Sequence, residues 1–346
     1  MDTRKFSIGI FSLLLGLAAF AATGYAHVRY VLTPEEVQKA ETAAKPVLFA
    51  GLSGLNLPYV IGTVLAILIT IYLAVRLRGN KSLERPGEML APLVGYTPLI
   101  LRLFIGTLLI FAGATGTLFG PELHLAGINP ALATVIANLE VVAGIFILFG
   151  HLIKVGALAI VLLWLLGLGT FGIGLFDHFD IIGIALYFLL AGCGPYAYDN
   201  LIIPTLHAKM RFLKALEDRI QAYRGMEVAF VRVALGLTLI WLGLTEKIIE
   251  PQLALAVVEK YTLPAMPSPE LFVLAAGLTE IGIGVLLIAG AFTRLVIFVT
   301  TVFVLLGVLA FKEQVIGHLD FVSIALTLLI NGSGPYRVED LFARRE

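Results

Sequence analysis

Two stretches of this chain read almost the same: HFDIIGIALYFLLAGCGPY at residues 178–196 and HLDFVSIALTLLINGSGPY at residues 318–336. They belong to a longer ungapped match between residues 131–201 and 271–341, in which 18 of 71 positions are identical. An offset of 130 extends the match upstream to Arg102 and Arg232. A repeat of this size predicts two copies of one folding unit. The polar residues that both copies share are therefore the first candidates for chemistry: Glu140/Glu280, His178/His318 and Asp180/Asp320.

The composition is that of a membrane protein. Hydrophobic residues make up 59% of the 346 residues and charged residues 14%, with a mean hydropathy of +0.97. So little charge would not cover a soluble surface of this size, which makes the lipid bilayer the expected partner. The formal net charge of zero gives no sign of nucleic-acid binding. The single cysteine excludes an internal disulfide, a CxxC pair and iron–sulfur ligation, so electron chemistry would need a bound cofactor or a partner protein.

The apolar segments predict an all-α polytopic fold with about ten transmembrane helices. Each segment is near the roughly 20 residues that cross a bilayer. They run over residues 6–26, 58–76, 99–119, 131–150, 155–175, 180–195, 227–246, 271–290, 295–311 and 319–333. Each repeat holds four of them, an even number, so both copies should insert in the same orientation. We therefore expect two parallel four-helix repeats related by a pseudo-twofold axis along the membrane normal.

The distribution of Lys and Arg predicts the topology. With the N-terminus in the cytoplasm, sixteen of these residues fall in cytoplasmic segments and six outside, the positive-inside pattern of a multi-pass plasma-membrane protein. The C-terminus is then also cytoplasmic. Residues 1–26 fit either a retained first helix or a cleaved signal peptide. Cleavage would leave His27 at the N-terminus, where its amine and imidazole could together chelate Cu(II).

Four regions follow from these segments. Residues 1–98 form an N-terminal membrane section of two segments, and residues 99–201 form the first repeat. Residues 202–226 read as a cytoplasmic amphipathic linker, with an apolar stripe between basic residues. Residues 227–346 hold the second repeat and the C-terminal tail.

Charged residues on the first two helices of each repeat are the candidate catalytic groups. Arg232 and Lys247 lie on one helical face with Gly236 and Gly243, which would let a neighbouring helix approach closely. Glu280 falls in the middle of the next span, where an ionisable group is expensive and by default functional. Its expected partner is Arg232. The pair is either a proton-accepting carboxylate tuned by an arginine or a structural tie between two helices.

The first copy offers Arg102 and Glu140 at the equivalent positions. It carries Thr117 in place of Lys247. The second copy is therefore expected to be the more active one.

The His-x-Asp pairs lie at the turn between the third and fourth helices of each repeat. These candidate cofactor-binding residues are His178, Asp180, His318 and Asp320. They read either as an aspartate N-cap beside an interfacial histidine, or as a proton relay or metal contact. No dedicated metal site is expected from them. The Gly-x-Gly-Pro-Tyr sequences that follow are predicted helix stops.

The second copy resembles the DoxX/DoxD family of four-helix membrane proteins. The motifs that carry the resemblance are Arg232-x-x-x-Gly236, Gly243-x-x-x-Lys247, Glu280-x-x-x-Gly284, Gly290-x-x-x-Arg294 and Gly332-x-Gly334-Pro335. With the first copy, the resemblance covers residues 99–201 and 227–341. The family is named for a membrane subunit of a thiosulfate:quinone oxidoreductase, and related four-helix proteins include cargo receptors and methylamine-utilisation proteins.

The resemblance implies a membrane subunit of a respiratory oxidoreductase assembly that would work with a soluble or membrane oxidoreductase partner. Quinone is then the expected cofactor, bound between helices near Arg232, Lys247 and Glu280, with Glu280 exchanging protons. The alternative is a non-catalytic transporter or membrane scaffold, in which the same charges form a pathway or hold the bundle together.

Overall fold

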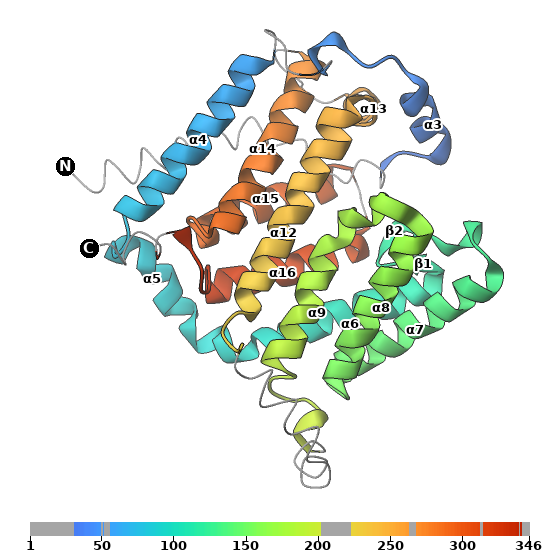
Figure 1. Ribbon diagram of the computed structural model, residues 1–346, viewed down its shortest axis with the longest axis vertical. Helices are drawn as coiled ribbons and strands as arrows, with labels where there is room; N and C mark the ends of the chain where they lie inside the picture. The colour runs from blue at the N-terminus through green and yellow to red at the C-terminus, as the bar shows by residue number, and fades with distance from the viewer. Residues whose placement is uncertain are drawn as a thin grey trace. The chain divides into compact units, whose positions relative to one another are not determined.

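The computed structural model describes residues 31–49, 51, 56–201, 223–262, 268–311, 314–338 and 340. Apart from one two-stranded hairpin, the regular structure in these ranges is helical (Figure 1). Four features expected from the sequence lie outside the described residues: the segment at 6–26, its cleavage site, His27 and most of the linker at 202–226.

The chain divides into two compact units, residues 1–70, 239–285 and 298–314 in one, and residues 71–238, 286–297 and 315–346 in the other. The second unit contains α5 (Lys81–Leu90), α6 (Thr97–Thr115), α7 (Pro130–Phe149), α8 (Ile153–Phe171), α9 (Phe179–Ala191) and α16 (Leu319–Asn331). The first unit contains α3 (Pro34–Thr42), α4 (Leu57–Arg76, up to residue 70) and α13 (Pro251–Lys260). Four helices have residues in both units: α4, α12 (Glu227–Leu244), α14 (Pro269–Ala289) and α15 (Thr293–Phe311).

Glycine allows α6 and α7 to pack closely, as the sequence predicts. A Cβ atom built at Gly106 would stand 2.6 Å from the Cβ of Leu148, and one built at Gly144 would stand 2.8 Å from the backbone nitrogen of Ile110. Atoms at these separations would overlap, so no larger residue fits without moving the helices apart. The sequence also sets the ends of α7. Asn129 caps its first turn through Oδ1, and Gly150 ends it at φ 60°.

Seven helices in the described ranges are long and apolar enough to cross a membrane, which supports a multi-pass membrane protein. These spans are Leu57–Arg76, Lys81–Thr115, Pro130–Phe149, Ile153–Ala191, Glu227–Ile249, Pro269–Ala289 and Thr293–Phe311, with a shorter apolar helix at Val315–Asn331. They do not confirm the expected count of about ten. The segments expected at 155–175 and 180–195 fall in one continuous span, where the 3₁₀ helix η4 (Gly172–His178) joins α8 to α9.

Two smaller features lie outside the apolar spans in the sequence. An antiparallel hairpin of β1 (Thr117–Leu118) and β2 (Gly120–His124) follows α6, and Phe119 between the strands has φ 60°. In the other unit, α3 packs on α13 through an apolar cluster, and the Lys260 ammonium donates to the carbonyl of Val31 and to Glu36. The polar segment that contains α3 is thereby anchored to the protein.

Candidate functional site

Arg102 is buried and satisfies backbone carbonyls at the end of α7 and in the segment that follows α9. Its guanidinium donates to the carbonyls of Ile147 and Leu148 at the end of α7, at 3.2 Å each, and to those of Cys193, Pro195 and Tyr196 after α9, at 3.0, 2.9 and 3.2 Å. The last carbonyls of a helix have no partner within that helix. Within a membrane, each one left unsatisfied costs several kcal/mol. The contacts of Arg102 are therefore structural.

Arg232, 130 positions after Arg102, makes three contacts of the same kind. It donates to the carbonyls of Ser333, Ile288 and Tyr336, the last two at 3.5 and 3.1 Å. Each of these acceptors lies 140 positions after an acceptor of Arg102. The expectation that each arginine pairs with the glutamate of its own copy is wrong for Arg102, because its donors are directed at helix ends, where carbonyl oxygens outnumber their intrahelical partners.

Glu140 is fully buried in the middle of α7, at the depth that the sequence predicts. Its Oε1 accepts a hydrogen bond from the backbone N–H of Phe119, at 2.8 Å. Its Oε2 has no hydrogen-bond partner among the described residues. The hairpin after α6 thus takes the place of the arginine that the sequence suggested.

Lys247, Glu246 and Glu280 form a buried charged cluster in the second copy. The Lys247 ammonium lies 2.9 Å from a carboxylate oxygen of Glu280 and 3.6 Å from one of Glu246. Lys247 stands in a single π-helical turn, η5 (Thr245–Ile249), at the end of α12. Such turns are rare and are frequent at functional sites. The expected partner of Glu280 is therefore replaced by Lys247.

Arg232 and Lys247 do not belong to one small site. Fifteen positions separate them along the continuous helical segment Glu227–Ile249. At about 1.5 Å per residue this is about 22 Å, much longer than the headgroup of a quinone. The expectation that Arg232, Lys247 and Glu280 surround one ligand is corrected accordingly. Lys247 and Glu280 stay together, and Arg232 belongs to the opposite end of α12.

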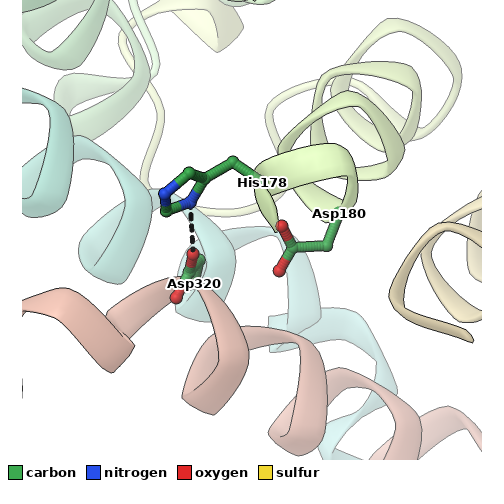
Figure 2. Close-up of side chains that lie close together, drawn as sticks. All are labelled: His178, Asp180 and Asp320. Atoms are coloured by element: carbon green, nitrogen blue, oxygen red, sulfur yellow. Dashed lines mark ion pairs between the residues drawn. The ribbon is translucent and has the colours of Figure 1, made fainter. Parts of the chain in front are cut away.

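The two His-x-Asp pairs supply a second buried polar cluster. His178, Asp180 and Asp320 are buried, and one potential ligand atom of each lies within 4.8 Å of the others (Figure 2). The Nδ1 of His178 is 3.8 Å from Oδ2 of Asp320, and its Nε2 is 2.5 Å from Oε1 of Glu122. Two motifs 140 residues apart in the sequence are thus brought to one place.

The local structure explains how the aspartates are held. Histidine, not aspartate, occupies the N-cap position of α9 and of α16, and neither histidine caps the helix with its side chain. The expected aspartate N-cap is therefore wrong. Asp180 and Asp320 lie in the first helical turns, where Oδ1 of each accepts from the next backbone N–H, at 3.0 and 2.7 Å. His318 is buried and lies two residues before Asp320, but it is not one of the three clustered residues.

Three residues that make buried polar contacts in the second unit were not singled out from the sequence. Glu122 contacts His178, Thr238 accepts from the backbone N–H of Asp180 at 2.9 Å, and Asp199 accepts from the first amides of α8 at 2.7 and 2.8 Å. Glu122 and Asp199 could have been found from the sequence, because carboxylates are rare in so apolar a chain. Glu122 stands in the hairpin that follows the first helix of its copy, where the second copy has α13 instead.

Comparison with known proteins identifies one part of the chain. No curated protein and no solved structure matches it. Residues 228–313 match the model of the DoxX family. The matched range contains Arg232, Lys247 and Glu280, while the His178–Asp180–Asp320 cluster lies outside it. Together with the apolar spans, this match shows that the chain is a membrane protein with a DoxX family domain at residues 228–313.

Proposed function

We propose that this chain is the membrane subunit of a respiratory-type oxidoreductase assembly, and that its DoxX domain binds a quinone at Lys247 and Glu280. One observation carries the proposal. A buried ammonium lies 2.9 Å from a buried carboxylate inside an apolar span of the matched domain. Ionisable groups at such depth are costly, and those that persist mark proton or substrate sites.

The two side chains fit the chemistry of a quinone. The ring carbonyls accept hydrogen bonds, and the Lys247 ammonium has three donors. Full reduction of a quinone consumes two electrons and two protons. Glu280 would pass the two protons to the reduced headgroup one after the other and recover each from water, and Lys247 would stabilise the oxygen on which negative charge develops. The electrons would come from an oxidoreductase partner, because the chain has a single cysteine and no iron–sulfur motif.

We further propose that residues 99–201 and 227–341 are two copies of one four-helix unit in the same orientation. The matched carbonyl contacts of Arg102 and Arg232 support this, as do the positive φ values shared by Gly192 and Gly332, 77° and 73°. A pseudo-twofold axis along the membrane normal would relate the copies. The first copy, with Thr117 at the position of Lys247, would be the structural one.

The proposed orientation places the C-terminus in the cytoplasm of a cell whose plasma membrane holds the protein. It rests on the distribution of Lys and Arg. Single cysteines introduced at Ser82 and Asp177 in a Cys193→Ser background test it. A membrane-impermeant maleimide applied to intact cells should label position 177 and leave position 82 unlabelled, and the reverse would overturn the orientation.

The quinone proposal is tested by the content of the purified protein. Mild purification followed by solvent extraction and mass spectrometry should detect a quinone with the wild type. A triple variant that combines Lys247→Met with Glu246→Gln and Glu280→Gln should fold and lose the bound quinone. Glu140→Gln is the matched control in the first copy and should retain it. Equal quinone content in all three proteins would refute the site and favour the transporter or scaffold alternative.

A further inference from the structure

We propose that His178, Asp180 and Asp320 bind a divalent first-row transition metal ion in a site to which both His-x-Asp motifs contribute. The three residues come from the starts of two helices, α9 and α16, within one compact unit. The site is separate from the Lys247–Glu280 cluster. It does not depend on the quinone proposal.

Glu122 orients the imidazole for such a role. Its carboxylate lies 2.5 Å from Nε2 of His178, so the Nε2–H donates to Glu122 in the neutral imidazole. The lone pair then resides on Nδ1 and faces the carboxylate of Asp320. The two groups form an ion pair when the imidazole is protonated, and a metal ion could take the place of that proton between them. A carboxylate behind a histidine whose other nitrogen binds the ion is the usual second layer of protein metal sites.

The distances favour an ion over a shared proton. At 3.8 Å, Nδ1 of His178 and Oδ2 of Asp320 are too far apart for a hydrogen bond. Two ligands held at about 2.0–2.1 Å from one tetrahedral zinc ion stand about 3.3 Å apart. Binding would therefore move this pair together by about 0.5 Å, the difference between that separation and the observed one. Figure 2 shows that the carboxylate of Asp180 is turned toward the same space.

The aspartates are preorganised by their helices. Each uses Oδ1 to accept the next backbone N–H, which leaves Oδ2 of Asp320 directed at the imidazole. Asp180 is further fixed because its own N–H donates to Thr238. Buried carboxylates are kept in proteins when they are paired or coordinate a metal. Two aspartates would neutralise a divalent ion, and a neutral imidazole completes a mixed nitrogen and oxygen ligand set that suits zinc, manganese or iron.

The test measures metal content and needs no assay of activity. The full chain is purified in detergent, stripped with a chelator, reloaded with Zn²⁺ or Mn²⁺, desalted and analysed by plasma mass spectrometry. The wild type should retain one ion per chain. His178→Ala and Asp320→Asn should lose it. His318→Ala is the matched control, since it removes the equivalent histidine of the other copy, and it should retain the ion.

Two further variants distinguish a metal site from a buried polar cluster that only holds helices together. Glu122→Gln keeps the ligands and weakens their orientation, so the affinity for Zn²⁺ should fall by about 10–100-fold. The triple variant of Lys247→Met, Glu246→Gln and Glu280→Gln should bind the ion as the wild type does, whether or not it retains quinone. Failure of the wild type to bind either ion would overturn the metal site, as would equal binding by wild type, Asp320→Asn and Glu122→Gln. Asp320→Asn and Glu122→Gln decide the matter if His178→Ala does not fold.

Discussion

The charged cluster at the end of α12 predicts an unequal response to removal of its two principal members. The Lys247 ammonium is 2.9 Å from Glu280 and 3.6 Å from Glu246. At an effective dielectric constant of about 20, these separations correspond to gross attractions of about 6 and about 5 kcal/mol. Glu280→Gln therefore leaves the lysine with a large part of its attraction. Lys247→Met removes the cation that both buried carboxylates face.

Breaking a buried ion pair by removing one partner costs about 3–5 kcal/mol, because the survivor stays buried and uncompensated. We expect a loss of that size in the free energy of unfolding for Lys247→Met. For Glu280→Gln we expect about 1–2 kcal/mol, since Glu246 still compensates the lysine. The neutral triple variant with Glu246→Gln should recover most of the loss, because no buried charge of the cluster is left unpaired.

Reversible unfolding in mixed micelles, with a rising fraction of dodecyl sulfate, measures these differences by circular dichroism. The wild type and a surface variant such as Lys81→Met supply the baseline. Equal losses for Lys247→Met and Glu280→Gln would refute the electrostatic account. So would a triple variant no more stable than Lys247→Met alone.

Three other predictions concern different parts of the chain. Arg102→Lys should lose about 2–4 kcal/mol in micelle unfolding, because three ammonium donors cannot replace five hydrogen bonds and helix-end carbonyls are left unsatisfied. Burial, helped by the charge of Asp199, raises the pKa of the Cys193 thiol, so the rate of maleimide labelling should have its midpoint above pH 9.0. The hydrogen bond from Lys260 lowers the pKa of Glu36 below its ordinary value of 4.5, and this stabilisation is complete above that value. It is lost as the pH falls through the folded-state pKa, so the difference in thermal midpoint between wild type and Glu36→Gln should vanish in acid.

Much of the helical fold could be predicted because its signals are local. Apolar length predicted α4, α7, α12, α14 and α15 to within a few residues. The glycines between α6 and α7 predicted close packing, and the overlap that a Cβ at Gly106 would create supports it. The hairpin at β1 and β2 could not be read in the same way. Its strands are too short to show the two-residue alternation that marks a strand.

Partners of buried charges were the least predictable part, because side-chain pairing depends on tertiary contacts and on the register of the helices. Arginine and glutamate on neighbouring helices look like partners in a sequence. In a membrane, however, the unsatisfied carbonyls at helix ends compete for the guanidinium. Arg102 donates to backbone carbonyls, and Glu140 instead accepts a hydrogen bond from the backbone N–H of Phe119. Backbone carbonyl acceptors carry no signal in the sequence, because every residue type has one.

The two similar stretches of sequence differ in a way that bears on chemistry. At the positions of Glu140 and Glu280, the same mid-span carboxylate meets a backbone amide in one copy and an ammonium in the other. An amide of a hairpin holds a carboxylate in place and carries no proton that it can exchange with a ligand. A lysine adds a mobile charge and three donors. Under the proposed function, the Glu140 stretch would serve as scaffold and the Glu280 stretch would hold the reactive group. The two His-x-Asp motifs instead contribute to one cluster, His178 and Asp180 from the first motif and Asp320 from the second.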